Sequence, residues 1–356
     1  MKAIKVSAPG KLHLLGEHAI VYGKPAIIAA VDKRCFVEIT SRKDKKIEIV
    51  SKNLKASKLF AEKEIVAKTQ DAQVKWESYV KTNDIFLLKS IVSDPLGFPA
   101  IIVGESLEYL KKKLPFGFTL SIKSDIPVGS GMGSSAALCV SVAGALSLLF
   151  SNKLNKETIN DIAFLCEQKK HGLPSGGDNA ACCFGGLIWY RKETADLKII
   201  KPVPFGFPKK IAKNFLVIHT GTPTESTGEM VSIVKDLYKQ KVEFVESILS
   251  SQEKLVRELL SVIKGGDDTL MIRIIRVGEK NLESLGVVSE FSKSIIRKIE
   301  ESGGAAKICG GGGRQRGTGV LLAYHHDKKV VEKIANNFNL LHFTIILGEE
   351  GVRREI

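Results

Sequence analysis

The segment Pro127-Val128-Gly129-Ser130-Gly131-Met132-Gly133-Ser134-Ser135 decides the fold. It follows Phe116–Lys123, which predicts a strand, and precedes the uncharged Ala136–Phe150, which predicts a buried helix too short to span a bilayer. Glycines let successive backbone amides point inward as an anion cradle, and the helix adds its positive N-terminal end. We therefore predict a phosphate-binding loop, although a glycine-rich turn can also be a plain connector. The loop contains neither the GxxxxGK[ST] pattern of P-loop nucleotide-binding proteins nor the GxGxxG pattern of dinucleotide-binding folds.

Two carboxylates follow this helix, Glu167 near the end of a second predicted helix and Asp178 in the glycine-rich run His171–Asn179. Beside a triphosphate, one carboxylate can ligate Mg²⁺ and the other can accept the proton of an attacking hydroxyl. The hydroxyl of Ser135 is a further candidate ligand for Mg²⁺. The alternative is that neither acid is functional, with Glu167 on the exposed face of a helix and Asp178 capping a turn.

Near the N-terminus, Pro9-Gly10-Lys11 closes a predicted strand and precedes Gly16-Glu17-His18. Lys11, placed beside Asp178, would keep that carboxylate ionised. His18 could donate to a carboxylate or carbonyl of a substrate. His13 is expected to be a core histidine without a functional role.

A second glycine-rich loop, Lys307–Gly319, lies between two predicted strands, Ala305–Cys309 and Val320–Tyr324. Its run Gly310–Gly313 allows another backbone to approach closely. Arg314 and Arg316 could meet phosphate, or they could be solvated side chains of a mobile hairpin.

The chain of 356 residues is long enough for two domains, and its mean hydropathy of +0.04 is typical of a globular protein. Its six cysteines show no CxxC spacing, which favours buried thiols in a reducing compartment. The net charge of +14 invites a nucleic-acid interpretation, but the Lys and Arg residues are interleaved with acids and form no aromatic-studded stripe. We therefore expect no nucleic-acid partner, no secretory signal and no membrane span.

Other patterns along the chain predict further elements. Asn155 is a candidate N-cap for the helix that carries Glu167. The proline-rich segment Pro202–Pro208 is a candidate domain junction. Predicted strands are residues 3–7, 25–31, 36–40, 47–50, 187–191, 215–219 and 343–347; predicted helices are 83–93, 100–113, several within 227–302, and 328–337.

Taken in order, these segments resemble the three motifs of the GHMP kinases, over most of the chain from Pro9 to Tyr324. PGKLHLLGEHAIVYGKPAI (Pro9–Ile27) and HGLPSGGDNAACCFGG (His171–Gly186) are similar to the mevalonate kinase versions of the first motif and of the segment around the catalytic acid. PVGSGMGSSAAL is similar to the family's phosphate loop. The resemblance implies an α+β, two-domain GHMP kinase fold. Residues 1–203 would form an N-terminal domain like ribosomal protein S5, with a left-handed βαβ crossover, and residues 204–356 a C-terminal ferredoxin-like domain.

The resemblance also implies the chemistry, a phosphoryl transfer from MgATP to the 5-hydroxyl of mevalonate in the cytoplasm. ATP and Mg²⁺ are the implied nucleotide and metal. The resemblance leaves open whether the chain forms a homodimer. Lys11 and Asp178 match the catalytic pair, with Asp178 as base or charge anchor; Ser135 and Glu167 match the magnesium ligands. The implied ATP-binding residues are Pro127, Gly129, Ser130, Gly131, Met132, Gly133, Ser134 and Ser135. The implied substrate-binding residues are Lys11, Glu17, His18, Asp178 and Thr227, with Gly310, Gly311, Gly312 and Gly313 as the third-motif loop.

This sequence departs from the family pattern in two places. Arg314-Gln315-Arg316 interrupts the third motif, and Glu225 and Gly228 stand where basic residues usually flank the substrate-contacting threonine. Two alternatives follow: a related GHMP kinase, for example one that acts on phosphomevalonate, or a catalytically silent ligand sensor. An intact set of Lys11, Ser135, Glu167 and Asp178 favours an active enzyme.

Overall fold

The computed structural model describes residues 3–194 and 197–356. Its strands are β1 (Ile4–Leu15), β2 (Ala26–Ser41), β3 (Lys46–Ser51), β4 (Ala56–Ala61), β5 (Phe118–Ser124), β6 (Leu187–Lys192), β7 (Lys198–Pro202), β8 (Phe215–Gly221), β9 (Ala305–Ile308), β10 (Gly319–Tyr324), β11 (His342–Phe343) and β12 (Arg353–Arg354). Its α-helices are α1 (Glu62–Thr82), α2 (Ile85–Ile91), α3 (Gly97–Tyr109), α4 (Ser134–Ser151), α5 (Lys156–His171), α6 (Gly177–Phe184), α7 (Lys209–Ala212), α8 (Thr227–Gln240), α9 (Val242–Gly265), α10 (Asp268–Ser284), α11 (Glu290–Glu301) and α12 (Lys328–Asn337). A 3-10 turn, η1, spans Ala19–Tyr22.

The first sheet is built around the long strand β2, which carries β1 on one edge along most of its length. Its C-terminal part, Cys35–Ser41, pairs with β5, while Ala26–Ala29 pair with β6. The sequence predicted two separate strands here. One continuous strand forms instead, because each half finds its own partner on the edge opposite β1. The resulting order is β12-β1-β2-β5-β3-β4, with β6 paired to β2 and β7 paired to β6.

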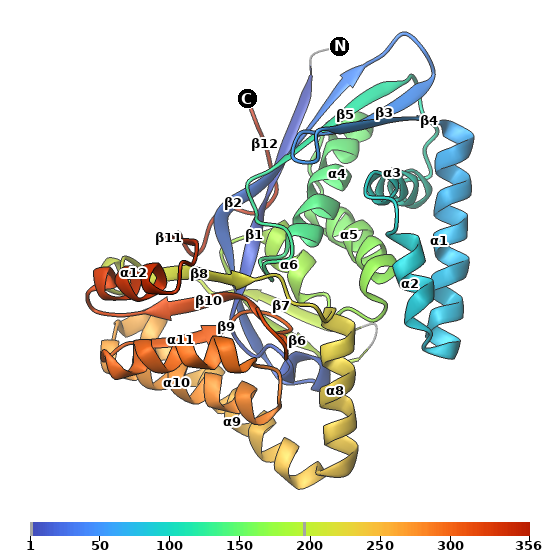
Figure 1. Cartoon of the computed structure of the whole chain (residues 1–356). Helices are drawn as coiled ribbons and strands as arrows, with labels where there is room; N and C mark the ends of the chain where they lie inside the picture. The colour runs from blue at the N-terminus through green and yellow to red at the C-terminus, as the bar shows by residue number, and fades with distance from the viewer. Residues whose placement is uncertain (1–2, 195–196) are drawn as a thin grey trace.

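Helices α1 to α6 pack beside this sheet, as Figure 1 shows. At their centre is α4, whose residues from Ala136 to Leu148 are buried apart from Leu138. By length and hydropathy α4 could cross a membrane, but 67% of that window is buried inside the protein. Helix α4 is therefore a core helix. Helix α1 was missed in the sequence, because its mostly exposed, charged face gives only a weak apolar stripe.

The second sheet has the order β11-β8-β10-β9 and is antiparallel. Helices α10 and α11 contact β9, and α12 contacts β8 and β10. Figure 1 shows α9, α10 and α11 stacked below this sheet in the view, with α12 beside β8 and β10. The strand predicted at 343–347 is shorter than expected, since only His342 and Phe343 pair with β8.

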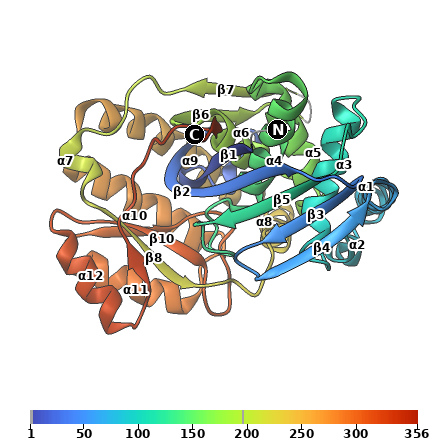
Figure 2. The same ribbon diagram turned by 90° about the horizontal axis from the view of Figure 1, so that it is seen from above.

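The two sheets are joined in two places. The chain crosses between them through the connector, residues 203–208, and Figure 2 shows it running from β7 to α7. The C-terminal residues then return to the first sheet, where β12 pairs with β1 and Leu347 bridges Val31. One hydrophobic core includes residues of both sheets and of α9. The boundary at 203/204 stays a prediction.

Candidate active site

The predicted phosphate loop lies between β5 and α4. Gly129, Gly131 and Gly133 have φ angles of 70°, 80° and 72°, which side-chain-bearing residues rarely adopt. Gly133 is the N-cap of α4, and no side chain caps the helix amides there. The first amides of a helix have no intrahelical acceptor, so this end is suited to an anion.

Both sheets hold the loop in place. On one side the amide of Lys11 donates to the carbonyl of Met132 at 2.9 Å, and on the other the amide of Val320 donates to Ser130 O at 2.9 Å. A Cβ at Gly131 would lie 2.5 Å from the carbonyl oxygen of Cys309. Close backbone contact therefore requires glycine here, and it fixes the loop at the seam between the two sheets.

Lys11 and Asp178 meet beside this loop, as predicted. Lys11 Nζ lies 3.0 Å from Asp178 Oδ2 and donates to the carbonyl oxygen of Gly131, also at 3.0 Å. Lys11 lies within β1 rather than at its end, because β1 continues past a bulge between Pro9 and Gly10. Asp178 was expected in a loop but lies in the first turn of α6, after the N-cap Gly176.

His13 has a partner that the sequence did not suggest. It is buried, as expected of a core histidine, but its Nε2 lies 2.9 Å from Asp178 Oδ1. Lys11 and His13 are alternate residues of β1, so their side chains project from the same face of the strand. That period of two is the signal that could have identified His13 as a second partner of Asp178.

The surroundings of Asp178 keep it ionised. Burial alone would raise the pKa of Asp178, but the charge of Lys11 and the hydrogen bond from His13 outweigh burial and hold that pKa well below its usual range. A carboxylate with a low pKa is a weak base. It can still accept a hydrogen bond from a hydroxyl and fix the position of the Lys11 ammonium.

The other predicted pair, Ser135 and Glu167, is also brought together. Ser135 Oγ donates to Glu167 Oε1 in a short hydrogen bond. Ser135 is in the first turn of α4, and Glu167 is on α5, a helix capped by the Asn155 side chain as predicted. Glu167 is buried, and its Oε2 lies 3.7 Å from His171 Nε2.

A hydroxyl and a carboxylate are hard oxygen donors, the kind that Mg²⁺ prefers. Over residues 3–194 and 197–356 no group of three or more His, Cys, Asp or Glu residues is placed to hold a metal. Mg²⁺ usually binds through one or two carboxylates together with water and substrate phosphates rather than in a protein cage. The pair Ser135 and Glu167 therefore fits the predicted metal site.

Glu17 and His18 both contact the third-motif segment, Lys307–Gly319. Glu17 forms a buried ion pair with Lys307, and His18 Nε2 is 3.0 Å from the carbonyl oxygen of Gly311. Within the described part of the chain, Glu17 Oε2 and His18 Nδ1 are buried and have no hydrogen-bond partner. Their predicted contact with a substrate stays a prediction.

Sequence reasoning gave no role to Lys307 or Glu279. Lys307 Nζ also donates to the carbonyl oxygen of Ile308 at 2.6 Å, and the amide of Ile308 donates to Glu279 Oε2 at 2.9 Å. Burial raises the pKa of Glu279 to about 8, although the Ile308 amide and Lys307 oppose that rise. An acid on the apolar stripe of α10, between Ile275 and Leu282, was the available signal.

Thr227 begins α8, directly after the N-cap Ser226, whose side chain accepts from the amide of Glu229. A Cβ at Gly311 would lie 3.2 Å from Thr227 Cγ2, so Thr227 borders the third-motif loop. Arg314 and Arg316 are exposed at the tip of that loop. The amide of Arg314 donates to Glu225 Oε1 at 3.3 Å.

The chain is similar to known proteins in sequence and in fold. Residues 101–186, which include the phosphate loop and Asp178, match the family model for the GHMP kinases N terminal domain. The chain is 30% identical to the mevalonate kinase of Pyrococcus horikoshii, over 100% of this chain and 98% of that protein. It is 31% identical to that of Thermococcus sibiricus, over 87% of this chain and 86% of that protein. The crystal structure of Methanococcus jannaschii mevalonate kinase superposes with a TM-score of 0.76 at 21% identity, covering 97% of this chain and 98% of that one.

Proposed function

Because the chain belongs to the mevalonate kinase family of the GHMP kinases, we propose that it transfers the γ-phosphoryl group of ATP to the 5-hydroxyl of mevalonate. The products are 5-phosphomevalonate and ADP. The observation that carries the proposal is the position of Lys11. One ammonium contacts both the Asp178 carboxylate and the Gly131 carbonyl of the phosphate loop, so the acid and the loop lie on either side of a single charge.

The proposed reaction is a direct displacement. The substrate hydroxyl donates a hydrogen bond to Asp178, and its oxygen attacks the γ-phosphorus while the bond to the β-phosphate oxygen breaks. The hydroxyl proton passes to Asp178 as the new bond forms, since the low pKa of this residue makes earlier proton removal unfavourable. Lys11 stabilises the negative charge that develops between the hydroxyl oxygen and the γ-phosphate.

The triphosphate is proposed to bind at the N-terminus of α4, cradled by the amides of residues 129–135. Ser135 and Glu167 would hold the magnesium ion, which neutralises charge on the phosphates when it is bound. Glu17 and His18 are proposed to orient the substrate, because Glu17 Oε2 and His18 Nδ1 are buried and lack hydrogen-bond partners in the described part of the chain.

The chain is also proposed to act in the cytoplasm. All six cysteines are buried and free, which fits a reducing compartment. No membrane and no nucleic acid are expected as partners, and the proposal leaves open whether the chain forms a homodimer. The buried position of α4 in the core supports the first of these expectations.

A coupled assay of ADP release tests the proposal with a panel of acceptors: mevalonate, phosphomevalonate, homoserine, galactose and shikimate. We expect mevalonate to have the highest kcat/KM. Absence of turnover with mevalonate would refute the proposal, and faster turnover of phosphomevalonate would identify a related kinase. ATP binding without turnover of any acceptor would identify a ligand sensor.

A further inference from the structure

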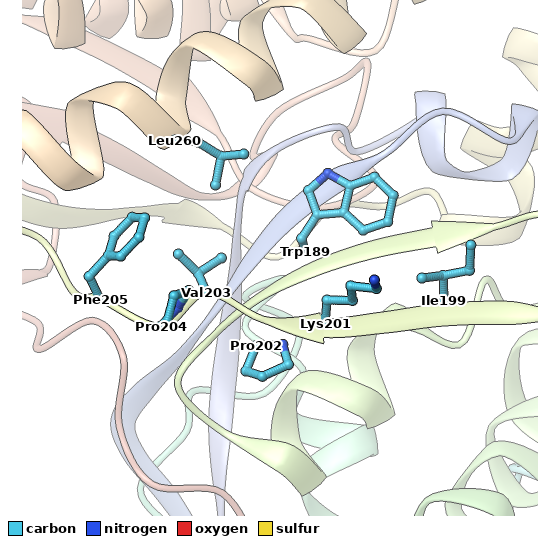
Figure 3. A pocket seen from close by; sticks show the side chains of 8 residues that line it. All are labelled: Trp189, Ile199, Lys201, Pro202, Val203, Pro204, Phe205 and Leu260. Atoms are coloured by element: carbon cyan, nitrogen blue, oxygen red, sulfur yellow. The ribbon is translucent and has the colours of Figure 1, made fainter.

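A cavity of about 480 Å³ lies where the β6–β7 hairpin, the connector and α9 meet. Figure 3 shows side chains of all three elements around it, with Leu260 of α9 facing Trp189 of β6 across the space. None of its lining residues belongs to the candidate active site. Its volume is within the range of sites that bind small organic molecules.

The lining follows from the register of the hairpin. Trp189 pairs directly with Lys201, so their side chains project from the same face, as does that of Ile199. Ile200, between the last two, faces the opposite side and packs on the smaller core beneath the hairpin. The remaining wall comes from Pro202, Val203, Pro204 and Phe205 of the chain leading into the connector, and from Leu260.

The two polar side chains that line this cavity, those of Trp189 and Lys201, are hydrogen-bond donors. Of the described residues that line it, Lys201 alone is charged, and its side chain is exposed. Among the residues that the structure describes, no ion pair is found for Lys201 and no hydrogen-bond acceptor for the indole N–H of Trp189. No acidic side chain lines the cavity among residues 3–194 and 197–356. An apolar wall with a single cation and a free N–H at its edge is complementary to a molecule that is apolar at one end and anionic at the other.

We propose that this cavity binds a small amphipathic anion, with its hydrocarbon part between Trp189, Val203 and Leu260 and its carboxylate or phosphate head at Lys201. A ligand placed there touches the β6–β7 hairpin, the connector and α9 together. Because it binds only the folded chain, it raises the melting temperature. This inference is independent of the phosphoryl-transfer proposal.

Trp189 is one of two tryptophans in the chain and reports directly on the cavity. The experiment uses the Trp76→Phe variant, so that all tryptophan fluorescence comes from Trp189. Three ten-carbon amphiphiles are titrated below their micelle concentrations: decanoate, decyl phosphate and decyltrimethylammonium. We expect saturable fluorescence changes with the two anions and about tenfold weaker binding of the cation, and the two anion arms distinguish a carboxylate from a phosphate head.

Charge reversal provides the decisive comparison. Lys201→Glu should reverse the preference in favour of the cationic amphiphile, whereas the matched variant Lys333→Glu, on the exposed face of α12, should leave it unchanged. Equal affinity for all three compounds, the same reversal in both variants, or displacement of decanoate by ADP would overturn the proposal. If Trp76→Phe does not fold, calorimetric titration of the unmodified chain gives the same comparison.

Discussion

The Nε2 atom of His13 lies 2.9 Å from Oδ1 of Asp178, although 165 positions separate the two residues in sequence. Lys11 contacts the other carboxylate oxygen, at 3.0 Å. Asp178 is therefore held at both oxygens by two side chains of the same strand. These two contacts fix the direction of the carboxylate relative to the phosphate loop.

Asp178→Asn should lower kcat by about 10²-fold or more, because an amide cannot take the hydroxyl proton. ADP binding should change little, since Asp178 faces the acceptor rather than the nucleotide. Steady-state kinetics and calorimetric titration with ADP measure the two effects separately. Turnover close to that of the unmodified chain would remove Asp178 from its proposed role.

His13→Leu should reduce kcat by about tenfold to a hundredfold, because Asp178 loses the partner that orients it. Loss of this hydrogen bond also raises the pKa of Asp178, so the acidic limb of the pH–rate profile should move to higher pH. His325→Leu, at another buried histidine far from the phosphate loop, is the control. An unmoved acidic limb in His13→Leu would contradict the assignment.

Ser135→Ala and Glu167→Gln should each raise the magnesium concentration needed for half-maximal rate, by about tenfold. Ser151→Ala, at the opposite end of α4, should not change it. Magnesium titrations at fixed ATP give the comparison. Superimposable curves for Ser135→Ala and Ser151→Ala would exclude Ser135 as a ligand.

Gly131→Ala should weaken ADP binding and destabilise the protein more than Gly286→Ala does. Both residues have positive φ, 80° and 74°, and so both variants carry the conformational cost of about 1 kcal/mol. Only at Gly131 would the new Cβ meet backbone, because nothing lies within 4 Å of a Cβ at Gly286. Urea unfolding and ADP titration of both variants test the difference; equal losses of stability and of affinity would show that the loop tolerates a side chain.

Glu279→Gln should make the protein more stable at alkaline pH. The pKa of Glu279 is raised from 4.5 to about 8, so the folded state binds a proton that the unfolded state releases. Stability therefore falls as pH rises from about 4.5 to 8, and glutamine removes this loss. Melting temperatures at pH 5 and pH 9 should show a gain for Glu279→Gln only at pH 9, of about 2 °C or more. Glu243→Gln, at an exposed position of α9, is the control. An equal gain in melting temperature at both pH values would contradict a raised pKa of Glu279.

Much of the site could be predicted because it depends on patterns of residues that are close together in the sequence. The strand–loop–helix around residues 127–135 and the Asn155 cap depend on glycine and on capping, whose preferences act within a few residues. Asp178 was placed in a loop because Gly176 and Gly177 resemble a turn, yet Gly176 is the N-cap of α6. Glu279 and Lys307 were missed because an ion pair or hydrogen bond between distant elements leaves no periodic trace.

The sequence by itself determined the kind of chemistry: an anion-binding loop at the start of an apolar helix, an ionised acid with a lysine, and a hydroxyl with a second acid. The tertiary structure decided which atoms meet. It aligned His13 with Asp178, seated the phosphate loop against Val320 of the second sheet, and returned β12 to β1 over a core that both sheets share. Local preferences act between neighbours in the chain, whereas these contacts depend on how buried surfaces far apart in sequence pack together.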